Sequence, residues 1–86
     1  MIEIYTKPNC TYCVYAKNYL KTKNISFMEY KLDVDFIKED IKEKYPEAKT
    51  YPVVVVDNKY IGGFVDLKNR LELNVQYLDG GAWNGS

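Results

Sequence analysis

The chain has 86 residues, a length that allows one domain with a small hydrophobic core. Its 12 Lys and Arg residues balance 12 Asp and Glu residues, so no net charge draws the chain to nucleic acid or an anionic membrane. The apolar run 53–56 is far too short to span a bilayer. We therefore expect a single globular domain with no nucleic-acid partner and no membrane partner.

The start of the sequence and its cysteine content bear on the compartment. The chain begins directly in a strand pattern, without the layout of a signal peptide. Two cysteines then fit a reducing cytosol, where paired cysteines are more often catalytic than structural. We expect a cytoplasmic protein whose domain spans residues 1–79. The turn-rich residues 80–86 are expected to form a flexible tail that is partly a cloning remnant.

Strand and helix patterns alternate along the chain. The stretch Val53-Val54-Val55-Val56 is β-branched and continuous, which predicts a central strand. Asp57-Asn58 after it is typical of a two-residue hairpin turn. In chain order we expect a strand at 2–6, a helix from 11 to about 23, a strand at 25–32, a helix that ends at Pro46, a hairpin of strands at 53–56 and 59–61, and a last helix.

Each expected helix has an apolar stripe and a polar start. Asp33 is the expected N-cap of the second helix, with Asp35 in its first turn, and Asp66 is the expected cap of the last. The stripes are Cys13, Ala16 and Leu20 in the first helix, Ile37, Ile41 and Tyr45 in the second, and Leu67, Leu71, Val75 and Leu78 in the third. The resulting order, β-α-β-α-β-β-α, predicts an α/β domain with a four-stranded mixed sheet and helices on both faces.

The only two cysteines, Cys10 and Cys13, stand three positions apart at the expected start of the first helix. Residues at this spacing lie on nearly the same helix face, with Cα atoms roughly 5–6 Å apart, the separation that a disulfide needs. At the helix N-terminus, free amides and the helix dipole favour a thiolate at Cys10. The spacing therefore indicates one activated sulfur and one resolving sulfur.

Three other interpretations of this pair remain open at this point. Both cysteines can be buried apolar residues. They can form a structural disulfide, although so short a loop removes little entropy from the unfolded chain. A structural zinc site normally needs four ligands, and the chain has no third cysteine and no histidine.

Three motifs together resemble the dithiol glutaredoxins, a family with the thioredoxin fold. The stretch Ile4-Tyr5-Thr6-Lys7-Pro8-Asn9-Cys10-Thr11-Tyr12-Cys13 is similar to the opening of such proteins. Thr50-Tyr51-Pro52 resembles the family's Thr-Val-Pro element, and residues 61–67 resemble its Gly-Gly-x-x-Asp segment. The resemblance covers residues 2 to about 78 and implies a thioredoxin fold with a redox-active Cys10–Cys13 disulfide.

The resemblance also implies a glutathione groove beside Cys10. Tyr51-Pro52 matches the family's cis-proline, which turns the backbone of Tyr51 toward the cysteines so that it can pair with a thiol peptide. Gly63 lets the backbone of the ligand approach closely, and Asp66 meets the γ-glutamyl ammonium of glutathione. The amides of Val65 and Asp66 take its α-carboxylate. Without the resemblance, a trans proline, a hairpin exit and a helix cap would explain the same residues.

Further residues of the implied site lie near the cysteines. Lys7 matches the family lysine that stabilises the Cys10 thiolate and contacts the glycine carboxylate of glutathione, although it can equally be a solvated turn lysine. The ring of Tyr12 lines the groove. Thr11, Thr50 and Gly62 are supporting residues.

Two positions depart from the family pattern. Thr11 replaces the usual proline of Cys-Pro-Tyr-Cys and frees a backbone N–H that can bond the Cys10 sulfur. Glutaredoxins with Ser or Thr at this position resemble those that can hold a [2Fe-2S] cluster between two protomers. In such a dimer, each copy of this chain would give Cys10 and one glutathione thiolate. No metal is expected otherwise. Tyr51 replaces the usual valine and adds a ring beside the groove.

The resemblance therefore implies a glutathione-dependent thiol–disulfide oxidoreductase of cell redox homeostasis. Its clients are disulfide-bonded or glutathionylated proteins, with ribonucleotide reductase suggested by the family, and it is monomeric unless a cluster bridges two copies. Three alternatives are a redoxin reduced by thioredoxin reductase, a non-catalytic iron–sulfur carrier, and a structural interaction module.

Overall fold

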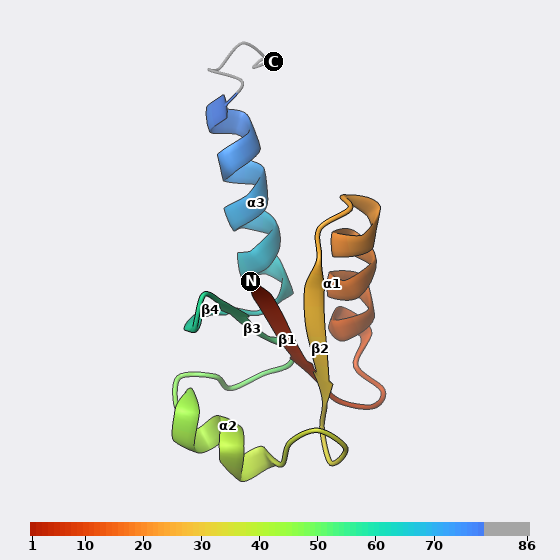
Figure 1. Cartoon of the computed structure of the whole chain (residues 1–86), viewed down its shortest axis with the longest axis vertical. Helices are drawn as coiled ribbons and strands as arrows, with labels where there is room; N and C mark the ends of the chain where they lie inside the picture. Colours follow the sequence, from red (N-terminus) through yellow and green to blue (C-terminus); the bar gives the residue numbers. More distant parts are fainter. Residues whose placement is uncertain (79–86) are drawn as a thin grey trace.

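A computed structural model of the chain describes residues 1–78, with side chains described through residue 72 (Figure 1). The order of elements is the expected one. They are β1 (Ile2–Thr6), α1 (Thr11–Thr22), β2 (Phe27–Lys31), α2 (Lys38–Lys44), β3 (Val53–Val56), β4 (Lys59–Gly62) and α3 (Phe64–Leu78). The prediction of a flexible tail over 80–86 falls outside the described residues. The buried positions predicted for Val75 and Leu78 fall outside the described side chains.

The four strands form one mixed sheet in the order β2-β1-β3-β4. β1 runs parallel to β2 and antiparallel to β3, so Ile4 lies between Glu29 and Val54. β3 and β4 form the expected hairpin. Its turn residues Asp57 and Asn58 have φ of 51° and 68°, the left-handed pair that suits a tight hairpin. Since β1 and β4 are each antiparallel to β3, their carboxyl ends meet at the same edge of the sheet.

Alternation along the strands divides the core between the two faces of the sheet. On one face, Ile4 and Val54 pack with Ala16 and Leu20 of α1 and with Leu67 of α3. The other face carries the layer under α2, formed by Tyr5, Phe36, Ile41, Tyr45, Val53 and Val55. The expected helices on both faces, and the stripe Cys13, Ala16 and Leu20, are therefore confirmed. None of the helices within residues 1–78 is long and apolar enough to cross a membrane.

The predicted N-cap of the second helix is wrong. Asp33 lies in a turn with φ 64°, and its N–H donates to the carbonyl of Phe36 at 2.6 Å. This contact keeps the chain outside the helix until Lys38, where the carboxylate of Asp40 accepts from the N–H of Ile37 at 3.0 Å. Ile37 is consequently 50% exposed, whereas Ile41 and Tyr45 are buried as predicted.

The last helix begins two residues before the predicted cap. Asp66 is the third residue of α3, and its carboxylate Oδ2 accepts from the backbone N–H of Gly63 at 3.1 Å. Asp66 therefore lies inside the first turn of the helix, and its carboxylate accepts from the free N–H of Gly63 at the helix start. Gly62 has φ 127°, and a Cβ at that position would collide with the Asp66 carboxylate. The β4–α3 junction thus depends on a glycine and an aspartate four residues apart.

An ion pair joins α1 to the edge strand β2. Lys17 Nζ lies 3.1 Å from Glu29 Oε2, and the hydroxyl of Thr6 donates to the same oxygen at 2.9 Å. Partial burial acts to raise the pKa of Glu29, but the hydrogen bonds from Lys17 and Thr6 and the charges of Lys17 and Lys31 outweigh it, so this pKa lies below its usual range. The pair is three-quarters buried, because the side chains are 27% and 21% exposed.

We predict that Gly62→Ala destabilises the fold by about 1–3 kcal/mol, because it combines an unfavourable φ with a displaced Asp66 carboxylate. Gly63→Ala is the control: its Cβ would make an ordinary contact of 3.6 Å with the carbonyl of Pro52. It should cost less than about 1 kcal/mol. Urea unfolding measures both changes, and equal losses would contradict this account of the junction.

We also predict that Glu29→Gln lowers stability at neutral pH by about 1 kcal/mol and that the difference vanishes in acid. A carboxylate whose pKa is lowered by folding stabilises the protein above its unfolded pKa. That stabilisation is lost as the pH falls through the folded pKa. Urea unfolding of both proteins at pH 7 and at pH 3 tests this, and a difference that stays constant would show that charge is not involved.

Candidate functional site

The two cysteines lie where the turn after β1 enters α1. Asn9 has φ 57°, and Cys10 takes the N-cap position with extended dihedrals (φ −110°, ψ 105°). The two residues form a disulfide, with Cα atoms 5.2 Å apart, within the separation expected for this spacing. Cys10 is partly exposed, whereas Cys13 is only 2% exposed. Cys10 is therefore the sulfur that an external disulfide can reach.

The sulfur of Cys10 serves as the capping acceptor of α1. The backbone N–H of Cys13 donates to Cys10 Sγ at 3.1 Å, and the first turn of the helix contains no acidic residue. A hydrogen-bond donor and the positive end of the helix dipole both favour a thiolate at this position. The sequence had suggested the N–H of Thr11 as the donor to this sulfur. The structure shows the N–H of Cys13 in that role. The side chain of Thr11 is exposed.

A groove of about 380 Å³ lies beside the start of α3. It brings together six of the residues predicted for glutathione binding or its support, from three separate segments of the chain. Tyr60 and Phe64 also line it and were not predicted. The full lining is Tyr12, Thr50, Tyr51, Tyr60, Gly63, Phe64, Val65 and Asp66. Pro52 and Gly62 are buried, and the Tyr51–Pro52 peptide bond is cis, as predicted.

Aromatic rings connect this groove to the start of α1. The ring of Tyr12 stacks on that of Phe64, with centroids 6.3 Å apart, and Tyr15 packs against both. Tyr12 and Val65 remain 56% and 59% exposed. The helix starts of α1 and α3 are therefore neighbours at one edge of the sheet, and the rings between them form an apolar wall.

Lys7 is held above the ring of Tyr51. Its Nζ lies 5.6 Å from the ring centroid, within the range of a cation–π contact. The Tyr51 ring also contacts Phe36, whose ring stacks on it with centroids 6.4 Å apart. Burial, and then the charge of Asp33, raises the pKa of Tyr51, so the phenol is neutral at physiological pH. The aromatic residue that departs from the family pattern thus contacts the predicted glutathione lysine.

The start of α3 offers groups of both polarities. The amides in the first turn of a helix have no partner within the helix and can bind a carboxylate. Among the described residues, Asp66 uses only its Oδ2 in a hydrogen bond, the one with Gly63. The groove can therefore accept an ammonium and a carboxylate carried on one small ligand.

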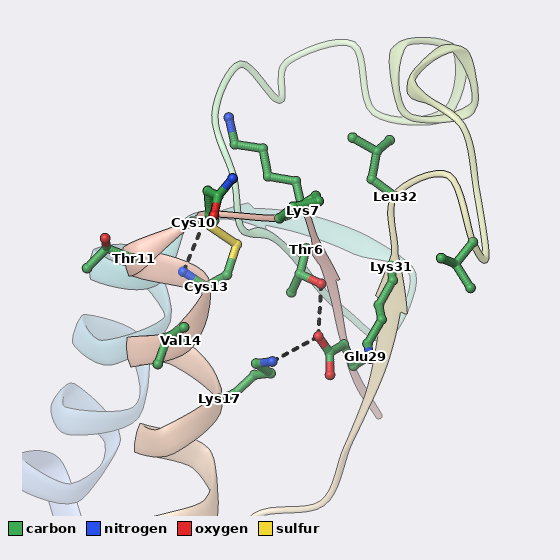
Figure 2. Close-up of a pocket in the computed structure, with 13 residues that line it drawn as sticks. Thr6, Lys7, Cys10, Thr11, Cys13, Val14, Lys17, Glu29, Lys31 and Leu32 are labelled. Carbon is green, nitrogen blue, oxygen red and sulfur yellow. Dashed lines mark hydrogen bonds and ion pairs between the residues drawn. A yellow bond between two sulfur atoms is a disulfide. The ribbon is translucent and has the colours of Figure 1, made fainter.

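A second, larger pocket of about 580 Å³ opens on Cys10 and Cys13 and shares no lining residue with the groove (Figure 2). Sequence reasoning did not predict it. The pocket contains the Lys17–Glu29 pair and the hydroxyl of Thr6. Its lining is Thr6, Lys7, Pro8, Asn9, Cys10, Thr11, Cys13, Val14, Lys17, Glu29, Lys31, Leu32 and Val34. A signal was available in the sequence, since Lys17 follows Cys13 by one helical turn.

Residues 1–78 contain no group of three or more His, Cys, Asp or Glu side chains that could hold a metal ion. A [2Fe-2S] cluster would have to take Cys10 as its ligand from each chain, because Cys13 is buried, and the Cys10 sulfur is itself bonded to Cys13. This donor set does not fit a cluster while the disulfide is closed.

Comparison with known proteins agrees with this geometry. The glutaredoxin family model matches residues 2–61. Glutaredoxin 3 of Escherichia coli (strain K12) is 39% identical over 66 residues, which are 77% of this chain and 80% of that protein. A glutaredoxin-like 8.6 kDa protein of the Clostridium pasteurianum rubredoxin operon is 34% identical over 74 residues, covering 86% and 93% of the two chains.

Solved structures are similar as well. The structure of glutaredoxin 1 from Francisella tularensis, complexed with cacodylate, has a TM-score of 0.70 at 28% identity, covering 87% of this chain and 95% of that one. The α/β domain predicted from the order of elements, and the thioredoxin fold that the resemblance implied, are therefore confirmed. With a partly exposed Cys10 at a helix N-terminus and a buried Cys13 behind it, the chain belongs to the glutaredoxin family and has a thiol–disulfide oxidoreductase role.

Proposed function

We propose that the protein is a glutathione-dependent oxidoreductase that reduces protein disulfides and glutathionylated proteins through Cys10 and Cys13. The observation that carries the proposal is the position of the two helix starts. One presents the Cys10 sulfur, and the other presents Gly63 and Asp66 in a groove at the same edge of the sheet. A thiol tripeptide needs such neighbouring sites, because its sulfur and its charged ends must be bound together.

The proposed pose follows from the charges of glutathione. Its γ-glutamyl ammonium meets the Asp66 carboxylate, and its α-carboxylate takes the first-turn amides of α3. The backbone of its cysteine lies along Tyr51. The glycine carboxylate extends toward Lys7, which Tyr51 supports by its cation–π contact. A groove of about 380 Å³ lies within the range of sites that bind small molecules.

The proposed reaction has two routes. In the dithiol route, the Cys10 thiolate attacks the client disulfide, forming a mixed disulfide and releasing one client thiolate that takes a proton from solvent. Cys13 then loses its proton and attacks Cys10, which releases the second client thiol and closes the Cys10–Cys13 disulfide. Two glutathione molecules reduce that disulfide through a Cys10–glutathione adduct and leave as glutathione disulfide. In the monothiol route, Cys10 takes glutathione from a glutathionylated client, and a second glutathione releases it.

The clients and the setting are part of the same proposal. We propose a cytoplasmic monomer that serves as an electron donor in redox homeostasis. Its clients are disulfide-bonded or glutathionylated proteins, and ribonucleotide reductase is one such protein suggested by the family. The donor assay below separates this protein from a redoxin that takes electrons from thioredoxin reductase.

We predict that Cys13→Ser keeps the turnover of glutathionylated substrates within about threefold of wild type and abolishes reduction of client disulfides. The monothiol route does not use Cys13, because Cys10 alone carries the glutathione adduct. The dithiol route requires Cys13. Coupled assays with glutathione and glutathione reductase measure both activities. Loss of both activities in a folded Cys13→Ser protein would contradict the assigned roles.

We predict that Lys7→Gln lowers kcat/KM for glutathione by about three- to tenfold, because it removes the partner of one carboxylate. Lys59→Gln, which removes an exposed charge on β4, is the matched control and should have no effect. The same proteins are assayed with thioredoxin and its reductase as the electron donor. Faster turnover with thioredoxin reductase, together with an unchanged response to glutathione in Lys7→Gln, would refute glutathione dependence.

A further inference from the structure

The pocket that opens on the disulfide, and that shares no lining residue with the groove, contains a held cation. Lys17 follows Cys13 by four residues on α1, so their side chains leave the same face of the helix one above the other. Both line the pocket, and Figure 2 shows the Lys17 ammonium directed at Glu29 below the disulfide. Because its side chain is only 27% exposed and paired at 3.1 Å, this lysine is held in one position.

Four charged side chains share the pocket with Cys13, and they differ in how they are placed. Lys7 comes from the turn after β1, Lys17 from α1, and Glu29 and Lys31 from β2. The Lys7 ammonium lies over the ring of Tyr51, and Lys31 is an exposed residue. Of the three lysines, only Lys17 is fixed by a partner inside the pocket. That partner, Glu29, is itself held by the hydroxyl of Thr6.

Cys13 needs such a cation more than Cys10 does. Cys13 is only 2% exposed, so burial penalises the negative charge that its sulfur must carry during attack. Cys10 lies at the helix N-terminus and accepts an amide hydrogen bond, whereas no comparable donor to Cys13 Sγ is present among the described residues. In a partly buried pocket a fixed positive charge is screened less than it would be on the surface.

We infer that Lys17, positioned by Glu29 and Thr6, stabilises the negative charge on the Cys13 sulfur during the resolving step. In that step the Cys13 thiol loses its proton to solvent, and its sulfur forms a bond with Cys10 Sγ. The Cys10–client sulfur bond breaks, and the leaving thiolate takes a proton from solvent. The client is reduced by two electrons and the cysteine pair is oxidised by two. The inference rests on the dithiol route and does not require glutathione.

A simpler role for the pair is to fasten α1 to β2 without acting on the chemistry. The two roles differ in the sign of their effects. If the pair only fastens the helix, loss of either partner loosens the site in the same way. If charge acts on Cys13, removal of the cation slows the resolving step, whereas removal of the nearby anion does not slow it.

A single-turnover experiment separates the two steps. Reduced full-length protein reacts with dithiodipyridine, a disulfide without formal charge, and stopped-flow absorbance follows the release of thiopyridone. The first release reports attack by Cys10 and depends on reagent concentration, and the second is unimolecular and reports attack by Cys13. The assay contains no glutathione, so its outcome is separate from the test of the proposed electron donor.

The variants are Lys17→Gln, Lys17→Arg, Glu29→Gln and, as a control, Lys21→Gln, which removes an exposed charge one turn further along α1. We expect Lys17→Gln to slow the second release by about three- to tenfold relative to the first. Lys17→Arg should restore it to within about twofold. Glu29→Gln removes the nearby anion and keeps a side-chain oxygen that can accept from Lys17, so it should make the second release faster. Lys21→Gln should match wild type in both releases.

Two results would overturn the inference. One is an equal slowing of the second release in Lys17→Gln and Glu29→Gln, which assigns the pair a structural role. The other is an unchanged ratio of the two releases in Lys17→Gln. Circular dichroism and urea unfolding of each variant establish that the comparison is made between folded proteins.

Discussion

The hydrogen bond from the amide of Cys13 to the sulfur of Cys10 is the contact on which the redox site depends. A helix needs acceptors for the N–H groups of its first turn, and a side chain at the N-cap normally supplies one. Here the N-cap side chain is that of a cysteine, and its sulfur is the acceptor. The requirement of the helix for an acceptor and the requirement of the chemistry for a sulfur anion are therefore met by one interaction.

The topology of the sheet determines what lies beside that sulfur. β1 leads into α1 and β4 leads into α3, and the two strands end at the same edge of the sheet because each is antiparallel to β3. Two helix starts are brought together in this way, with the rings of Tyr12 and Phe64 between them. The first start activates a nucleophile, and the second offers amides and a carboxylate to a small ligand. The site is therefore formed by two helix starts that are far apart in sequence.

Cys10 and Cys13 differ in their surroundings as much as in their roles. Cys10 is accessible and lies on the positive end of a helix, whereas Cys13 is buried above a pocket that contains the Lys17–Glu29 pair. A buried nucleophile is protected from outside reagents but loses the solvation that its anion needs. A neighbouring ammonium held inside the fold can replace part of that solvation. The ion pair that joins α1 to β2 thus has a bearing on both stability and chemistry.

Local sequence patterns predicted the elements and the cysteine pair because those features depend on nearby residues. The spacing of Cys13, Ala16 and Leu20 defines a helix face, and the hairpin follows from Asp57-Asn58. The helix starts were predicted less well. Asp33 and Asp66 both have the side chain of an N-cap, but the contacts of Phe36 and Gly63 moved each of them to another position.

Sequence alone determined that this chain has two cysteines at helical spacing, in an order of elements that builds a mixed sheet. Sequence alone could not show that Lys17 faces Glu29, since that contact joins a helix to an edge strand 12 residues away. Nor could it show that Lys7, in the turn after β1, lies over the ring of Tyr51, which comes just before β3. Such pairs form only when the sheet brings separate segments together. The periodicity of a segment specifies which of its faces is buried, whereas tertiary packing decides which charged side chains form pairs.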